Sequence, residues 1–110
     1  MIWTAWNNGR HHESGTGCGF KVEAVDRDRW FSRGWPTVLV DMPSSSGRVL
    51  AEVNINKPSF GGADCRELIG QAIGRWLISE GYAPWPAGAP PKFEVRPSHG
   101  HTFEVIGLAA

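Results

Sequence analysis

The chain has 110 residues, no formal net charge and 41% hydrophobic residues. A chain of this length holds one hydrophobic core, so we expect a single domain over residues 1–110. The balanced charge argues against a protein that binds duplex nucleic acid by neutralising many phosphates. Six tryptophans and five phenylalanines are more than so small a core needs, and aromatic side chains are enriched where proteins recognise partners.

The sequence predicts a soluble, cytoplasmic protein. Its first residues contain neither a basic leader nor a long apolar run, and no stretch approaches the roughly 18 to 20 apolar residues that cross a bilayer. Cys18 and Cys65 stand at positions suited to apolar side chains, which favours two reduced core thiols over a disulfide. No cofactor and no membrane partner are expected.

A strand predicted over residues 2–6 is followed by the longest polar stretch, residues 7–19. Loops of this length within compact domains are often functional. The glycines of this loop lead into a second strand, over residues 18–25, whereas a dinucleotide-binding loop leads from a strand into a helix. The alternative to a functional loop is a mobile connector with a glycine bulge.

Residues 26–36 interleave acids, arginines and aromatics. Asp26 and Asp28 could together hold a divalent cation, but beside arginines they more simply form ion pairs or cap a helical turn. Arg29, Trp30 and Trp35 could instead form a stacking surface for bases or for a partner chain.

Two further strands are predicted over residues 37–42 and 48–55, joined by a turn rich in serine and glycine at residues 44–47. Every second residue in both is apolar, which is the period of half-buried antiparallel strands. The inward-facing residues are expected to be Val38, Val40, Met42, Val49, Ala51, Val53 and Ile55.

The clearest helical pattern begins after Asp64. Apolar residues repeat there at intervals of three and four, and Asp64 with Glu67 forms a capping box at the start. Asp64 also occupies the helix N-terminus, where the free amides would otherwise favour an anion. Gly81 is a typical helix stop. The residues expected on the buried face are Cys65, Leu68, Ile69, Ala72, Ile73, Trp76 and Leu77.

The chain continues in a stiff connector over residues 83–91, whose prolines exclude a helix or a central strand. Trp85 stands between two of these prolines. Alternation over residues 92–96 and 102–106 predicts a final hairpin. The predicted fold is therefore α+β, an antiparallel sheet of five to six strands packed on one amphipathic helix, in the order β-β-β-β-α-β-β.

The four histidines lie in two predicted loops, His11 with His12 and His99 with His101. With Glu13 they would close a zinc site if the two loops met. The alternative function is therefore a small metal-dependent hydrolase that uses some combination of His11, His12, Asp26, Asp28, His99 and His101. If the loops do not meet, the histidines are exposed or capping residues.

Six short segments, spread over nearly the whole chain, are similar to segments of other small proteins. They are WNNG at residues 6–9, GCGFKV at 17–22, DRD at 26–28, IGRWL at 73–77, APWP at 83–86 and PPKFE at 90–94. In these segments the chain resembles a group of short uncharacterised bacterial proteins, some of which travel on mobile elements such as integron gene cassettes. The resemblance implies no activity and no catalytic residue.

We expect a non-enzymatic binding module, monomeric or dimeric, whose partner is a protein or a small ligand. The recognition surface should draw on side chains whose type and loop placement suit contact with a partner. These residues are Trp6, Asn7, Asn8, Arg10, Arg29, Trp30, Trp35 and Trp85. At least one of Trp30, Trp35 and Trp85 should then be partly exposed and line a groove or a subunit contact. A third interpretation makes the tryptophan and proline segments a homodimer interface.

Overall fold

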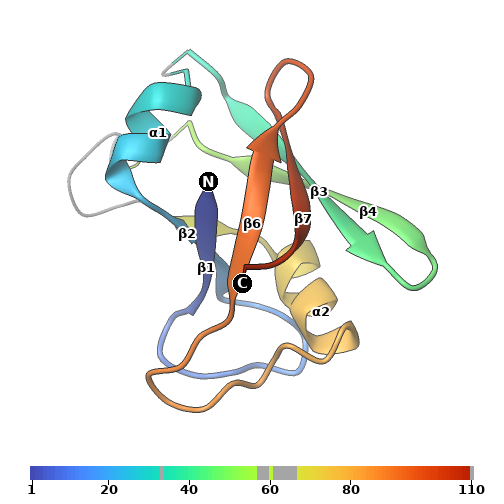
Figure 1. The fold of residues 1–110 in the computed structure, drawn as a ribbon. Coiled ribbons are helices and arrows are strands. Elements are labelled where there is room, and N and C mark those ends of the chain that lie inside the picture. The colour runs from blue at the N-terminus through green and yellow to red at the C-terminus, as the bar shows by residue number, and fades with distance from the viewer. Residues whose placement is uncertain (33, 57–59, 61–66, 110) are drawn as a thin grey trace.

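The computed structural model describes residues 1–32, 34–56, 60 and 67–109. Within these ranges, seven strands form one sheet in the order β4-β3-β7-β6-β1-β2-β5 (Figure 1). The same ranges contain two short helices, α1 (Ala24–Trp30) and α2 (Gln71–Ser79). The strands are β1 (Ile2–Asn7), β2 (Cys18–Val22), β3 (Thr37–Ser44), β4 (Gly47–Asn54), β5 (Glu67–Ile69), β6 (Lys92–Pro97) and β7 (Thr102–Leu108).

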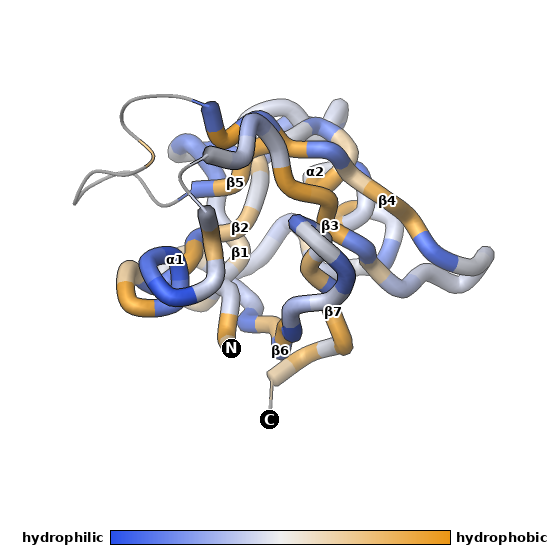
Figure 2. The backbone as a smooth tube through the Cα atoms, turned by 90° about the horizontal axis from the view of Figure 1, so that it is seen from above, coloured by the Kyte–Doolittle hydropathy of each residue, from blue (hydrophilic) through white to orange (hydrophobic). Residues whose placement is uncertain are grey.

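The sheet curls until its two edge strands, β4 and β5, approach each other, which makes a nearly closed barrel. Seen from above, the strands follow one another round a curve, and α2 lies beside the remaining gap (Figure 2). The predicted alternation of inward and outward residues is confirmed along β3, β4, β6 and β7. The strand predicted over residues 18–25 ends at Val22, because α1 begins at Ala24. The inward residues that are almost wholly buried include Val38, Val40, Met42, Ala51, Val53, Phe93, Val95, Phe103 and Val105.

An aromatic cluster fills the inside of the barrel, with Trp3 at its centre. The ring centroid of Trp3 lies 5.6 Å from that of Phe20 and 5.5 Å from that of Phe103. Phe31 stacks on Phe103 at 4.5 Å. All five phenylalanines and two of the six tryptophans, Trp3 and Trp76, are buried. The core therefore uses much of the aromatic content that the composition assigned to a surface.

Helix α2 packs against β2 and β4 and so bridges the gap between the two edges of the sheet. Its buried face carries Ile73, Trp76 and Leu77, as predicted. The indole N–H of Trp76 donates to the carbonyl oxygen of Pro43 at 2.7 Å, which ties the helix to β3. No helix in the described ranges is long and apolar enough to cross a membrane.

The predicted fold class is wrong about the sheet. The sheet has seven strands rather than five to six, and β3 runs parallel to β7, with Val40 opposite Phe103. Alternation shows that a strand is half-buried, but it contains no information about which strand lies beside it or in which direction. The element order is β-β-α-β-β-β-α-β-β, with two helices where one was predicted.

The predicted start of the main helix is also wrong. Helix α2 begins at Gln71, and Leu68 pairs with Phe20 as part of β5. Glu67 lies in that strand, so it forms no capping box at a helix start. Ile69, predicted to be buried, is 41% exposed. Asp64 and Cys65 lie outside the described residues.

The close approach of β5 to β2 depends on Gly19. A Cβ atom added at Gly19 would lie 1.9 Å from the carbonyl oxygen of Leu68, so no larger residue fits between the two strands. The sequence signal for β5 is weak because a strand of three residues is too short to display a period. Leu68 suits either a helix face or a strand.

Helix α1 was missed because its buried residue is an arginine. Arg27 is 7% exposed, and its guanidinium donates to the carbonyl oxygen of Phe60 at 3.0 Å. It also pairs with the carboxylate of Asp28 at 3.1 Å. A helix whose inner side is charged shows no apolar stripe, so hydrophobic periodicity cannot detect it.

Candidate functional site

The eight residues predicted to form one recognition surface lie at two ends of the sheet. β1 and β2 run antiparallel, with Trp3 opposite Val22 and Asn7 opposite Cys18. The loop of residues 8–17 therefore lies at the Asn7 end of β1, which we call the lower end, and α1 follows β2 at the upper end (Figure 1). The first group is Trp6, Asn7, Asn8, Arg10 and Trp85, and the second is Arg29, Trp30 and Trp35.

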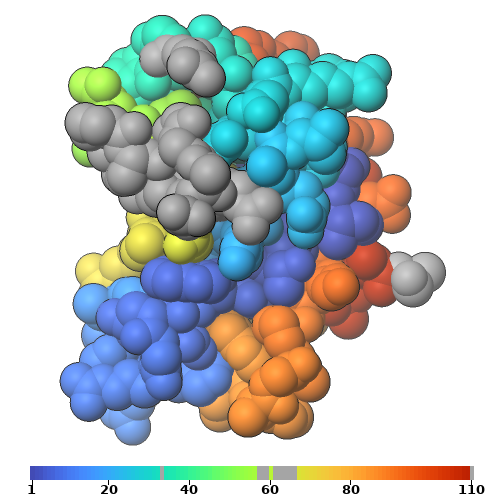
Figure 3. All heavy atoms as spheres, turned by 90° about the vertical axis from the view of Figure 1, so that its left-hand side faces the viewer, coloured from blue at the N-terminus to red at the C-terminus, as the bar shows by residue number. Residues whose placement is uncertain are grey.

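At the lower end, the loop of residues 8–17 lies beside the segment that joins α2 to β6 (Figure 3). This segment, residues 80–91, includes the predicted connector and is called the connector from here on. The ring of His11 meets the ring of Trp85 edge to face, with centroids 4.4 Å apart. Nδ2 of Asn7 lies 3.3 Å from Nε2 of His11. Two segments far apart in the sequence thus form one surface. We call it the lower surface and define it as Trp6, Asn7, Asn8, Arg10, His11, His12 and Trp85.

The lower surface is rich in hydrogen-bond donors. Asn8 and Arg10 are exposed, and Nε of Arg10 donates to Nε2 of His12 at 3.3 Å. Glu13 is the single acid in residues 8–17. Trp85 is partly exposed, and its other side packs against the core. Amide and guanidinium donors in the loop that contacts this indole suit a ligand that offers carbonyl or carboxylate oxygens.

Two glycines hold the loop of residues 8–17 against α2. A Cβ atom added at Gly74 would lie 2.0 Å from the carbonyl oxygen of Gly15, and one at Gly15 would lie 2.6 Å from the backbone nitrogen of Arg75. Nearby, Nε2 of Gln71 donates to the carbonyl oxygen of Ser14 at 3.1 Å. The loop is therefore packed against the helix at Gly15. This close contact was not predicted. The sequence feature that could have indicated it is Gly74, a glycine inside a helical pattern.

The upper end holds the other three predicted residues. The guanidinium carbon of Arg29 lies 5.0 Å from the ring centroid of Trp30. Trp30 is 39% exposed, whereas Trp35 is partly buried and packs against the core. Trp30 and Trp85 are partly exposed, as predicted. That one of the three tryptophans lines a groove or a subunit contact stays a prediction.

The histidines are divided between the same two ends. His11 and His12 belong to the lower surface, whereas His99 and His101 lie at the upper end, in the turn between β6 and β7. Nδ1 of His101 lies 2.6 Å from the carbonyl oxygen of Thr37. Within residues 1–32, 34–56, 60 and 67–109, no three His, Cys, Asp or Glu side chains are grouped to hold a metal ion. The convergence that the hydrolase alternative requires is not seen there.

A groove of about 260 Å³ lies between β4 and α2. Val49 and Trp76 supply apolar lining, and Ala72, Arg75 and Ser79 line it from an exposed stripe of the helix. Ala72, predicted to lie on the buried face, is exposed. The sequence analysis missed this groove because both Val49 and Ala72 fit a core pattern. Their placement depends on how the hairpin of β3 and β4 sits over α2.

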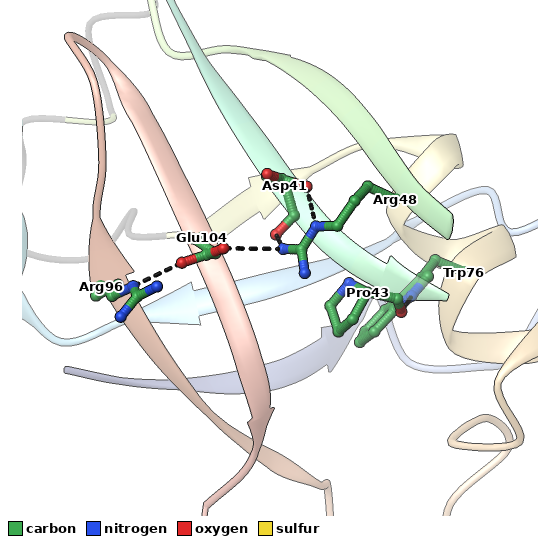
Figure 4. A network of polar contacts seen from close by, with 6 residues as sticks. All are labelled: Asp41, Pro43, Arg48, Trp76, Arg96 and Glu104. Carbon is green, nitrogen blue, oxygen red and sulfur yellow. Dashed lines mark hydrogen bonds and ion pairs between the residues drawn. The ribbon is translucent and has the colours of Figure 1, made fainter. Parts of the chain in front are cut away.

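A row of ion pairs crosses four neighbouring strands (Figure 4). Nε of Arg96 lies 2.6 Å from Oε1 of Glu104, and the other oxygen of Glu104 lies 3.5 Å from the guanidinium of Arg48. Nε of Arg48 lies 2.7 Å from Asp41. Each exposed pair of this kind contributes roughly 0.2–1 kcal/mol to stability. Because every carboxylate in the row has an arginine partner, the row is better suited to joining strands than to acid–base chemistry.

Cys18 is a buried free thiol, as predicted. Burial raises the pKa of the Cys18 thiol above its ordinary value, because the thiolate would lose its hydration. A thiol in this environment is a poor nucleophile. Cys65 lies outside the described residues.

Comparison of the chain with protein-family models, with curated proteins and with solved structures gives no match. The resemblance to short bacterial proteins of mobile elements therefore stays a prediction. The function has to be argued from the geometry alone.

Proposed function

We propose that the chain is a non-enzymatic binding module and that the lower surface is its recognition surface. The observation that carries the proposal is the edge-to-face contact of His11 with Trp85 at 4.4 Å, because it joins the loop and the connector into one surface. The loop is itself held against α2 at Gly15 and Gly74. An indole held by its neighbours loses little side-chain entropy when a ligand binds.

The chemistry of the lower surface indicates the class of ligand. The amide groups of Asn7 and Asn8 and the guanidinium of Arg10 belong to the same end of the molecule as the indole of Trp85, which contacts His11 of the loop. The loop contains one acid, Glu13. A protein segment or small ligand that carries a carboxylate fits this set of donors. Duplex nucleic acid fits less well, because the chain has no net positive charge. A cytoplasmic location stays a prediction.

The six tryptophans provide the readout for a test, since each indole N–H gives its own nuclear magnetic resonance signal. The ¹⁵N-labelled protein is titrated with N-acetylglutamate and with the acetylated, amidated dipeptide Glu-Glu. We expect the indole signals of Trp6 and Trp85 and the backbone signals of residues 7–12 to shift together. The indole signal of Trp30, at the upper end, should stay unchanged.

Two matched variants make this titration decisive. Trp85→Ala should lower the affinity for the bound probe about 10-fold, as expected for an interface aromatic worth ~1–2 kcal/mol. Trp30→Ala removes an indole that is 39% exposed at the other end and should leave the affinity unchanged. The proposal is wrong if the shifts follow Trp30 and Trp35, or if neither probe shifts residues 7–12.

A further inference from the structure

We propose that the outer edge of β4 pairs with the same edge of a second copy of this chain, around a two-fold axis at Leu50. The two curled sheets would then join through an antiparallel pair of β4 strands. This inference concerns a different part of the molecule from the lower surface, so it stands or falls independently of the proposed function.

The first observation is an unpaired strand edge. In the described chain β4 pairs with β3 alone. Just beyond β4, the N–H of Ile55 donates to the carbonyl oxygen of Pro36, on the β3 side. In an antiparallel pair, the N–H and C=O groups of successive residues point alternately toward and away from the partner strand. Odd-numbered residues of β4 therefore face β3, and Leu50 and its even-numbered neighbours point their backbone groups away from it. Across the described residues, no backbone hydrogen bond joins that edge to another element. Such an edge is a template for another strand.

The second observation is that this edge is complementary to itself. An antiparallel pair centred on Leu50 places Leu50 opposite Leu50 of the second copy. It also places Arg48 opposite Glu52 of the second copy, and does so twice. Leu50, Arg48 and Glu52 share the outer face of β4, where Leu50 is 62% exposed. The guanidinium of Arg48 contacts Asp41 and Glu104 of its own chain, so Glu52 of the second copy would join these two carboxylates. Directly opposite residues of opposite charge, and paired apolar residues, stabilise antiparallel strands.

The charges also select one register. If the pair were centred on Arg48, two arginines would lie opposite each other, and a centre at Glu52 would oppose two glutamates. Like charges directly opposite destabilise a strand pair. Several registers allow the outward-pointing backbone groups of two β4 strands to face each other near the middle of the strand. Of these registers, the one centred on Leu50 places residues of opposite charge opposite each other. The pattern within β4 therefore specifies a second copy of this strand as its partner.

The groove between β4 and α2 fits the same arrangement. Val49 faces the groove, and the pairing centred on Leu50 places Ala51 of the second copy opposite it. Ala51 is 3% exposed in its own copy, so the second copy would border the groove of about 260 Å³ rather than fill it.

Sedimentation equilibrium tests the dimer. The wild-type chain should form a dimer that dissociates on dilution, and Leu50→Lys should raise the dissociation constant at least about 30-fold by placing two ammonium groups opposite each other. The matched control is Ile106→Lys, which changes a residue of β7 that is 50% exposed and lies off the edge. It should leave the dissociation constant unchanged. Thermal melting checks that both variants fold.

Charge reversal tests the register. Glu52→Arg opposes arginines twice and should weaken self-association. Arg48→Glu should do the same, with melting curves recorded because Arg48 also pairs with Asp41 and Glu104 of its own chain. An equimolar mixture of the two variants should recover the dimer, since opposite charges then face each other again. The proposal is overturned if the wild type is monomeric at every concentration. The edge of β4 would then be free to pair with a strand of another protein. It is overturned equally if Leu50→Lys and Ile106→Lys associate alike, or if the mixture stays monomeric.

Discussion

Replacement of Ile73 with aspartate is expected to unfold the protein. Ile73 is fully buried on the inner side of α2, where the helix bridges β2 and β4. A carboxylate at that position would lie in the core without a partner, at a cost of about 4 kcal/mol or more. Domains of this kind have a total stability of about 5–15 kcal/mol. Circular dichroism should show the loss of the cooperative thermal transition, or a large fall in its midpoint.

The control for this change lies in the same helix. Ile78→Asp introduces the same side chain at a residue that is 37% exposed, so it should lower the free energy of unfolding much less. If Ile73→Asp melts like the wild type, the packing of α2 against the sheet is not as described. If both variants unfold, the effect comes from aspartate in the helix rather than from burial.

Replacement of Trp3 with alanine is expected to lower the free energy of unfolding by about 3–5 kcal/mol. Trp3 is fully buried among Phe20, Phe31 and Phe103, with ring centroids 5.6, 6.3 and 5.5 Å away. Among the residues that the structure describes, its indole nitrogen has no hydrogen-bond partner. The loss would therefore come from packing and from the cavity left behind. Denaturant unfolding monitored by far-ultraviolet circular dichroism measures it.

Trp30→Ala is the matched comparison, since it deletes the same side chain where it is 39% exposed. It should cost about 1 kcal/mol or less, as is usual for surface substitutions. Equal losses in the two variants would mean that Trp3 is not the centre of the aromatic cluster.

Most of the strands could be predicted from the sequence because alternation depends only on neighbouring residues. The inward positions of β3 and β4, such as Val38 and Val53, were predicted correctly for this reason. The pairing of β3 with β7 could not be predicted, since it joins segments separated by most of the chain. The short β5 and the charged inner side of α1 gave no period to detect.

The candidate site was predictable in its residue types but not in its arrangement. Asn7 and Trp85 are partly exposed and Arg10 is exposed, as their loop placement indicates, and their role in binding stays a prediction. That His11 lies against Trp85, while Trp30 lies at the other end, follows from the path of β1 and β2 through the sheet. No local pattern contains that path. The composition also suggested that more aromatic residues lie at the surface than the structure shows, because all five phenylalanines lie in the core.

The proposed recognition surface requires that the loop of residues 8–17 meet residues 80–91 through His11 and Trp85. A nuclear Overhauser spectrum of the protein in solution measures this directly. The ring centroids lie 4.4 Å apart, so cross-peaks are expected between the imidazole protons of His11 and the indole ring protons of Trp85. The core pair Trp3 and Phe20, at 5.6 Å, is the internal reference. A spectrum that shows the reference cross-peaks but none between His11 and Trp85 would contradict the proposed recognition surface.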